Sequence, residues 1–394
     1  MKVAVVGAGI AGLTAAYFLA KDGHQVHVYE QEKGPAEKCS YANGGQISVS
    51  NSEVWTTWGN VAKGVRWMFQ KDAPLLIRPE LDFDKAVWLA KFLYHTANND
   101  YLRNTIETIQ IGIESRSALM QIANEESIDY DQKYKGILHI YKNPKYFVQA
   151  QQVQELYNAY GCEWEILDIK QVYDKDPALR HMQGIVGGVY TPSDWTGDIH
   201  KFCVALTKVL QAKYGVVFTY QYDQCFIDDV HEITVIAAGV NSPAIAKSFG
   251  DSLPIYPVKG YSITIPAANA VNHFTMPQVS LLDDEAKIVT STLGNRLRVA
   301  GTAELAGHNY TIRKDRIEPL LRWVRTNFPH LVVNDYSEWA CLRPMTPNMM
   351  PIVGQSKVKS NVYYHTGHGH LGWTLSAGTA RSLAKLIKER KKYE

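Results

Sequence analysis

The first thirty or so residues carry the pattern that most constrains the fold of this chain. Residues 2–6 are apolar and β-branched, as in a buried strand, and they run directly into Gly7-Ala-Gly9-Ile-Ala-Gly12. A helical stretch to about residue 20 follows, and a second strand over residues 25–29 closes on Glu30. Strand, glycine turn, helix and strand in this order predict a βαβ unit that binds a dinucleotide.

Each glycine of the pattern has its own physical role. Gly7 permits a tight turn, Gly9 lets the backbone approach a pyrophosphate, and Gly12 lets the helix pack closely on the strand. The pyrophosphate is then expected at the helix N-terminus, where unpaired N–H groups and the helix dipole favour an anion. Glu30 is placed to accept hydrogen bonds from the adenosine ribose, and its charge disfavours the 2′-phosphate of NADP. The motif alone does not separate FAD from NAD.

Composition limits the alternatives. The 394 residues exceed one ordinary domain, and 46% hydrophobic against 20% charged residues allows a sizeable core. A net charge of +2 without a basic stripe argues against nucleic acid as a partner. The five cysteines are spread out and form no C-x-x-C pair, which argues against a disulfide framework or a thiolate zinc site and for a reducing compartment. The uncharged run from residue 3 to residue 20 could pass for a signal peptide or a membrane span, but the βαβ unit accounts for it.

Further motifs lie far from the N-terminus. Residues 40–47 read Ser-Tyr-Ala-Asn-Gly-Gly-Gln-Ile, and a glycine pair flanked by Asn and Gln indicates backbone lying against a ligand. The other segments are Val258-Lys-Gly-Tyr-Ser-Ile-Thr-Ile-Pro266, Leu342-Arg-Pro-Met-Thr-Pro347, Pro351-Ile-Val-Gly354 and Thr366-Gly-His-Gly-His-Leu-Gly372. Together with the N-terminal fingerprint, they resemble the D-amino-acid oxidase superfamily of flavoproteins. Within it, the chain looks most like the small subunit of the bacterial D-amino-acid dehydrogenases, from residue 1 to near the C-terminus.

The resemblance implies FAD as the cofactor. By this resemblance, the N-terminal glycines and Glu30 would bind the ADP half of FAD, and residues 40–47 would line the stretch from the pyrophosphate to the flavin. The C-terminal glycine loop would contact the carbonyl edge of the flavin. The matching positions are Gly7, Gly9, Ile10, Ala11, Gly12, Glu30, Gln31, Ser40, Asn43, Gly44, Gly45, Gln46, Ile47, Gln224, Ala238, Gly239, Arg343, Gly367, His368, Gly369, His370, Leu371 and Gly372. The chain departs from the family between residues 226 and 235, where its link is shorter than the usual hairpin, and this bears on Gln224 as the adenine contact.

Two side chains are candidates for catalytic contact with the substrate. Arg343 offers a planar guanidinium that matches a carboxylate bidentately, and the resemblance assigns it the carboxylate of the substrate. Tyr261 lies in a strand-like segment, so its hydroxyl is a candidate to reach the pocket over the flavin, the alternative being a half-exposed strand tyrosine. His365, His368 and His370 have no acidic or thiolate partner nearby in sequence, so their interleaved glycines favour a flavin loop over a metal site.

The resemblance implies an activity as well as a cofactor. A D-amino acid with a neutral amine would transfer its Cα hydride to flavin N5, and the imino acid would hydrolyse to a 2-keto acid and ammonia. The electrons would then pass to a quinone or another carrier. Two alternatives stay open: an oxidase that uses oxygen and acts on glycine, sarcosine or L-amino acids, and a non-catalytic flavin-binding subunit of a larger complex. Chirality does not follow from the sequence.

The motifs predict an α/β fold with two interleaved domains. A Rossmann-like FAD-binding domain would take residues 1–50, 165–245 and 336–394. An α+β substrate domain, built on a mixed or antiparallel sheet, would take residues 51–164 and 246–335. Residues 51–95 hold many aromatic residues beside basic ones, which favours either domain core or a peripheral membrane patch with access for a quinone. The cysteine pattern favours a cytoplasmic protein, and the aromatic segment leaves contact with the inner face of the cell membrane as an open alternative.

Overall fold

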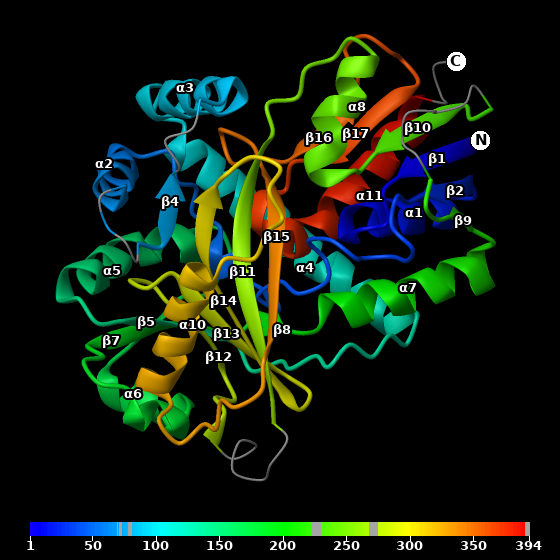
Figure 1. Cartoon of the computed structure of the whole chain (residues 1–394). Helices are drawn as coiled ribbons and strands as arrows, with labels where there is room; N and C mark the ends of the chain where they lie inside the picture. The colour runs from blue at the N-terminus through cyan, green and yellow to red at the C-terminus, as the bar shows by residue number, and fades with distance from the viewer. Residues whose placement is uncertain (69, 71–72, 78–80, 223–229, 268–274, 391–394) are drawn as a thin grey trace.

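Two β-sheets form the frame of the computed structural model, which describes residues 1–390 except 69, 71–72, 78–80, 223–229 and 268–274. The smaller sheet has six strands in the order β16-β17-β10-β1-β2-β9. The larger has nine, in the order β15-β11-β14-β13-β12-β5-β7-β6, with β4 beside β14. Figure 1 shows the long strands of the larger sheet running down the middle of the molecule and the smaller sheet at the upper right.

Successive groups of strands along the chain belong to the two sheets in turn. The smaller sheet comprises β1 (Lys2–Val6), β2 (Gln25–Tyr29), β9 (Val217–Thr219), β10 (Ile233–Ile236), β16 (Ile352–Gln355) and β17 (Val362–Thr366). The larger comprises β4 (Leu75–Ile77), β5 (Ile137–Tyr141), β6 (Glu165–Leu167), β7 (Gly187–Thr191), β11 (Tyr256–Pro266), β12 (Ser280–Asp283), β13 (Ile288–Leu293), β14 (Arg296–Leu305) and β15 (Ser337–Met345). A separate pair is formed by β3 (Gln46–Ile47) and β8 (Trp195–Thr196).

The helices cover the sheets and join them. The α-helices are α1 (Ile10–Lys21), α2 (Trp58–Trp67), α3 (Phe83–Ala97), α4 (Tyr101–Glu125), α5 (Pro144–Ala159), α6 (Ile169–Lys175), α7 (Ile199–Tyr214), α8 (Ser242–Ser248), α10 (Lys314–Asn327) and α11 (Gly372–Arg390). The 3₁₀ turns are η1 (Val49–Asn51), η2 (Pro177–His181), η3 (Gly239–Asn241) and η4 (Gly369–Leu371).

The smaller sheet is a parallel sheet buried on both faces, apart from the antiparallel edge strand β16. Parallel strands need helices on both faces, and the central strands β1 and β10 are accordingly almost wholly apolar, whereas β2 and β17 also carry polar residues such as His27 and His365. One face packs on α1, α7 and α11 in the largest hydrophobic core, and the other contacts α8. This arrangement confirms the predicted Rossmann-like α/β unit and brings the carboxyl ends of β1, β10 and β17 to one edge.

The larger sheet is mostly antiparallel, with the parallel pairs β5–β12 and β4–β14, and is therefore mixed as predicted. Ile263 and Ile265 on β11 pack against Ile317 and Leu320 of α10, so this helix covers one face. The opposite face borders a cavity that the smaller sheet closes from the other side. The two sheets thus enclose the site between them.

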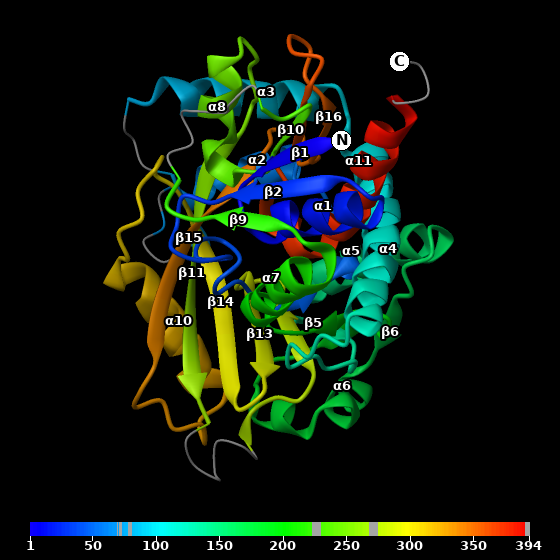
Figure 2. The same cartoon turned by 90° about the vertical axis from the view of Figure 1, so that its right-hand side faces the viewer.

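The pairing of strands corrects the predicted domain boundaries. Residues 165–245 were assigned to the FAD-binding domain, but β6 and β7 within them pair with each other and with β5 in the larger sheet. β15 belongs to that sheet as well. Conversely, α4 was assigned to the substrate domain, yet its Leu119 and Ile122 are buried in the core with α1 and α11. Figure 2 shows α4 lying alongside α11 and α1. Strand pairing and helix docking are long-range, which is why motif positions alone did not give them.

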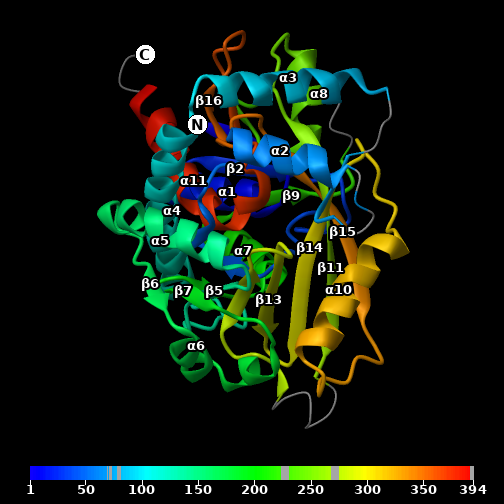
Figure 3. The same ribbon diagram turned by 90° about the vertical axis from the view of Figure 1, so that its left-hand side faces the viewer.

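The aromatic segment divides between core and surface. Trp88 is buried and packs with Val54 and Val258, which fits the predicted core. In contrast, α2 has no buried residue, and Trp58 is 62% exposed and Phe83 82% exposed. Figure 3 shows α2 and α3 at the same corner of the molecule. Within the described residues, no helix has the length and the apolar run that crossing a bilayer requires.

Candidate active site

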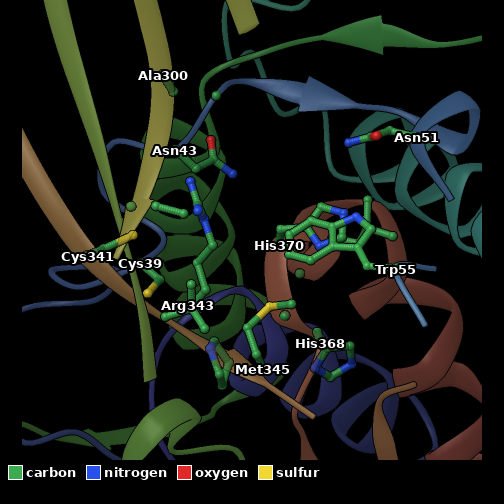
Figure 4. A pocket seen from close by; sticks show the side chains of 18 of the residues that line it. Cys39, Asn43, Asn51, Trp55, Ala300, Cys341, Arg343, Met345, His368 and His370 are labelled. Carbon is green, nitrogen blue, oxygen red and sulfur yellow. The ribbon is translucent and has the colours of Figure 1, made fainter. Parts of the chain in front are cut away.

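A cavity of about 980 Å³ lies between the carboxyl ends of the smaller sheet and the open face of the larger one. Nearly all of the predicted site residues border it, although they come from seven separate stretches of the chain. Those that line it are Gly7, Gly9, Ile10, Ala11, Glu30, Gln31, Ser40, Asn43, Gly44, Gln46, Ala238, Gly239, Tyr261, Arg343, Gly367, His368, Gly369, His370, Leu371 and Gly372. Figure 4 shows its interior, with Arg343 and Asn43 on one side and Trp55 and Asn51 across from them.

The turn between β1 and α1 forms one end of the cavity. Gly7 has a φ of +109°, and its N–H donates to the carbonyl of Tyr29 at 2.7 Å. A Cβ on Gly12 would lie only 1.8 Å from the carbonyl oxygen of Gly7, so only glycine lets the helix approach the strand this closely. Ser40 adds its hydroxyl, which accepts from the N–H of Ile10 at 3.1 Å. The helix therefore begins at the cavity, with the geometry that binds anions.

Glu30 is buried at the end of β2 and borders the cavity. Its carboxylate accepts hydrogen bonds from the N–H of Ala8 at 2.6 Å and of Glu32 at 2.9 Å. Burial raises the pKa of Glu30, while the backbone N–H donors oppose that rise. Nearby, Asn241 donates to the side chain of Gln31 at 3.1 Å, which links the β2 end to the turn that follows β10. An acidic group held in this way accepts ribose hydroxyls and repels a phosphate.

The larger sheet holds the loop at residues 42–44 through hydrogen bonds to the carbonyl oxygens of the loop. Ser262 donates to the carbonyl of Ala42 at 2.8 Å, Arg298 to that of Asn43 at 3.0 Å, and Ser291 to that of Gly44 at 2.7 Å. Burial lowers the pKa of Arg298 to about 10. A Cβ on Gly44 would lie 2.7 Å from Val289 Cγ2, so the loop rests directly on the sheet. Three strands therefore fix the loop that borders the cavity.

The C-terminal glycine loop joins β17 to α11. Gly367 and Gly369 have φ values of +75° and +58°, in the region that favours glycine. His365 is buried, with Nδ1 3.0 Å from the carbonyl of Ala11 and Nε2 2.8 Å from Thr379 Oγ1, and His368 Nε2 lies 2.9 Å from the same hydroxyl. Burial lowers the pKa of His365 to about 4. These imidazoles brace the loop, and in the described part of the chain no group of three or more potential ligands is arranged around a metal position.

Arg343 projects from β15 into the space above Gly260 of β11. A Cβ on Gly260 would lie 2.2 Å from Arg343 Nη2, so the glycine makes room for the guanidinium. The side chain is half-buried and borders the cavity. Within the described residues, its guanidinium makes no hydrogen bond or ion pair to a protein group, although a buried cation normally has an anionic partner. The free fork is therefore available to an anionic ligand.

The Tyr261 hydroxyl does not reach the cavity, contrary to the prediction. Tyr261 is 1% exposed, packs in the core under α10, and donates to Glu304 at 2.5 Å. The next residue, Ser262, points to the opposite face of the sheet and donates a hydrogen bond to the loop at residues 42–44. Side chains alternate between the two faces of a strand, so a tyrosine adjacent to Ser262 and Gly260 faces away from the site. Tyr261 therefore borders the cavity through its backbone and not through its hydroxyl.

Three other predicted residues support the site without lining it. Gly12 packs against the β1 turn, Gly45 has a φ of +75° beside Asn43, and Ile47 is fully buried in the core. Gln224 lies outside the described residues.

The sequence interpretation missed several residues that line the cavity, among them Asn51, Trp55 and His139. Trp55 stacks on His370 with ring centroids 4.8 Å apart, and His139 Nε2 lies 3.0 Å from Ser50 Oγ. No spacing rule connects these residues to the glycine motifs. The tryptophan stood out only as one of many aromatic residues in the 51–95 segment.

Comparison with known proteins gives the family. Residues 2–386 match the sequence model of a family described as FAD dependent oxidoreductase. The chain therefore belongs to this family, and its cofactor is FAD.

Individual relatives narrow the likeness. A protein of Mesorhizobium japonicum called D-amino acid dehydrogenase 3 is 46% identical over 404 residues, covering 98% of this chain and 97% of its own. A D-amino acid dehydrogenase of Rhizobium johnstonii is 37% identical, covering 98% and 96%. Among solved structures, glycine oxidase of Bacillus cereus has a TM-score of 0.75 at 21% identity, covering 99% of this chain and 95% of its own. L-proline dehydrogenase of P. horikoshii has a TM-score of 0.71 at 14% identity, covering 99% and 93%. These two structures share the fold.

The cavity fits FAD. The β1–α1 turn and Glu30 suit a pyrophosphate and a ribose, as described above. Trp373 and His370 line the cavity, and each has one buried nitrogen atom, Nε1 and Nε2 respectively, without a hydrogen-bond partner in the described structure. Buried polar atoms are normally hydrogen-bonded, so a polar ligand in the cavity accounts for them.

Proposed function

We propose that the protein catalyses the FAD-dependent oxidative deamination of D-amino acids to 2-keto acids and ammonia. The observation that carries the proposal is the guanidinium of Arg343, which has no hydrogen-bond or ion-pair partner among the described residues and borders the same cavity as the proposed FAD-binding residues. The names of the relatives from Mesorhizobium japonicum and Rhizobium johnstonii, both D-amino acid dehydrogenases, supply the substrate class.

The residues of the chain contribute binding and orientation. Arg343 would take the carboxylate of the amino acid through two parallel N–H···O bonds, which fixes the plane of the substrate. FAD, when bound, would supply the acceptor for the hydride from Cα, and this hydride carries the two electrons of the oxidation. Trp55 and His370 form a stacked wall across from Arg343, which limits where Cα can lie and excludes water from that side. Orientation of this kind, without a Ser/His/Asp triad, is what the reaction needs.

The first test is anaerobic reduction of the flavin by amino acids in D and L pairs. We expect D-amino acids to bleach the flavin absorbance and their L counterparts to leave it unchanged. Arg343→Met should lower kcat/KM about 100-fold, since a charge-assisted bidentate contact contributes on the order of 1.5–3 kcal/mol, and Arg343→Lys should restore only part of this. Retained flavin absorbance in both variants would show that the cofactor site is intact. Failure of every D-amino acid to reduce the wild-type flavin would overturn the proposal.

We further propose that the electrons pass to a quinone at the inner face of the cell membrane. The support is the corner formed by α2 and α3, where apolar Trp58 and Phe83 are exposed and α2 also carries the exposed Arg66. Exposed aromatic residues next to basic ones are typical of contact with an anionic bilayer surface. Lys63, Val65 and Met68 also border the cavity, so the corner adjoins the site.

Co-sedimentation with vesicles tests this second proposal. We expect the protein to bind vesicles containing anionic lipid and to reduce a water-soluble quinone analogue faster than it reduces oxygen. Trp58→Ser combined with Phe83→Ser should weaken vesicle binding and leave flavin reduction unchanged. Tyr160→Ser, which replaces an exposed aromatic residue just beyond α5, is the matched control. Equal vesicle binding by all forms, or rapid reoxidation by oxygen, would favour a water-soluble oxidase instead.

A further inference from the structure

Two cysteines lie next to each other in the wall of the cavity. Cys39 lies in the loop between β2 and β3, one residue before Ser40, and Cys341 lies on β15, two residues before Arg343. Both border the cavity, and Figure 4 shows their sulfur atoms on neighbouring side chains. The two thiols are within hydrogen-bonding contact of one another, and Cys39 Sγ donates to the carbonyl of Leu342 at 2.7 Å.

The pair differs from the other described cysteines. Cys162 and Cys203 are each fully buried in a hydrophobic core, away from the cavity, and burial raises the pKa of each. In the facing pair, the contact with Cys39 and the positive charge of Arg343 lower the pKa of Cys341, while the contact with Cys341 and burial raise the pKa of Cys39. One thiol is thus favoured as the nucleophilic thiolate and the other keeps its proton. This asymmetry is typical of a reactive cysteine beside a resolving one.

We propose that Cys39 and Cys341 form an oxidative modification site that reacts with hydrogen peroxide to give a reversible disulfide. The thiolate of Cys341 attacks one peroxide oxygen, the O–O bond breaks, and hydroxide leaves and takes up a proton as water. The sulfenic acid on Cys341 is then attacked by the sulfur of Cys39, which forms the S–S bond and releases a second water. In balance, two thiols lose two electrons and two protons, and one peroxide becomes two waters.

The disulfide would join the two walls that hold the cofactor. The loop that carries Cys39 includes Ser40, which bonds the start of α1, and Asn43, which Arg298 holds. β15 forms the edge strand of the larger sheet beside β11. A covalent link between them restricts the separation that release of FAD requires, so the oxidised protein should retain its cofactor longer. This inference depends on FAD binding and is independent of the substrate.

The first experiment maps the thiols of the intact holoenzyme. The protein is treated with hydrogen peroxide, unfolded, alkylated with N-ethylmaleimide, digested and analysed by mass spectrometry, with and without dithiothreitol. We expect a cross-linked peptide pair that contains Cys39 and Cys341 and that dithiothreitol separates, while Cys162 and Cys203 stay alkylated. Recovery of Cys39 and Cys341 as separate alkylated or over-oxidised peptides would overturn the proposal.

The second experiment measures release of FAD after dilution into mild urea, followed by flavin fluorescence. Oxidised wild-type protein should release FAD about tenfold more slowly than reduced protein, because a cross-link of this kind constrains loop opening. Cys39→Ser and Cys341→Ser should each abolish the difference, and Cys203→Ala should keep it. The flavin absorbance of each variant verifies that it folds. If oxidised wild type that contains the disulfide released FAD at the same rate as reduced wild type, the proposed effect of the disulfide on cofactor retention would be wrong.

Discussion

Among single residues, Gly260 decides whether Arg343 can lie where it does. Its missing Cβ leaves space that the guanidinium fills, with Nη2 2.2 Å from the position a Cβ would take. Gly260→Ala should displace the guanidinium without removing its charge, so that KM for the amino acid rises and kcat/KM falls about tenfold or more. Steady-state kinetics with a dye acceptor measure this. FAD content should stay unchanged.

A matched control separates the effect from a general loss of stability. Gly59 is an exposed glycine of α2 whose nearest atom to an added Cβ lies at 3.9 Å. Gly59→Ala should keep the wild-type KM. If Gly260→Ala kept it as well, Arg343 would have no role in anchoring the substrate.

His365 makes the stability of the protein dependent on pH. Burial lowers its pKa from 6.5 to about 4, so the folded protein keeps it neutral while the unfolded chain takes up a proton below pH 6.5. The unfolded state therefore binds more protons as the pH falls from 6.5 towards 4, and the free energy of unfolding decreases over that interval. At pH 5.5 the loss is about 1.4 kcal/mol from this one group.

Urea unfolding at pH 7.5 and pH 5.5 tests this dependence. His365→Gln should narrow the difference in free energy of unfolding between the two pH values by about 1.4 kcal/mol, whatever its effect at pH 7.5. His181→Gln, which replaces an exposed histidine, should leave the difference as in wild type. An unchanged difference in His365→Gln would contradict the buried, neutral state.

Some of the residues at the cavity could be predicted from the sequence and others could not. The position of Gly7, Gly9 and Glu30 at the cavity could be predicted because it depends on neighbours within one βαβ unit. The position of Arg343 at the cavity was predicted from the family resemblance, but the facing Gly260 that makes room for it was not. Tyr261 was misjudged because the face of a strand depends on register, and β11 shifts register against β14 between Gly260 and Tyr261. Trp55 and His139 reach the cavity only through tertiary packing.

At the level of elements, three strands hold one loop. Ser262 on β11, Ser291 on β13 and Arg298 on β14 donate to consecutive carbonyl oxygens of residues 42–44. Removing one such bond should loosen the loop and weaken FAD binding, by about fivefold for Ser291→Ala and more for Arg298→Met, since hydrogen bonds from charged groups contribute more. Fluorescence titration of the apoprotein with FAD measures the change. Ser337→Ala, at the exposed start of β15, is expected to bind FAD like wild type, and equal affinities throughout would argue against the positioning role.

The elements themselves were predictable to different degrees. β1, α1 and β2 have strong local signals, and the structure has them within a residue or two of the predicted limits. The assignment of β6, β7 and α4 to the wrong domain has a common cause, because each is defined by partners far away in the chain. β7 lies between β5 and β6, and α4 packs on α1 and α11. Hydrophobic periodicity predicts that an element is buried but does not say against what.

For the whole molecule, interleaving predicts cooperative unfolding. The chain passes repeatedly between the two sheets, and three strands of the larger sheet hold the loop at residues 42–44, so we expect the two sheets to unfold together. We expect far-ultraviolet circular dichroism and flavin fluorescence to report the same transition. Added FAD at 100 times its Kd should stabilise the fold by about 2.7 kcal/mol and raise Tm by several degrees. Two separate transitions, with only the first dependent on FAD, would show that the sheets unfold independently.

The space that Gly260 leaves for Arg343 has a consequence for enzyme engineering. The guanidinium of Arg343 fills the space above Gly260, so the proposed anchor for the substrate carboxylate would lie at one fixed position. A library that aims to change the accepted side chain would do best to leave β11 and β15 untouched. Diversity belongs on the wall across from Arg343, for example at Asn51.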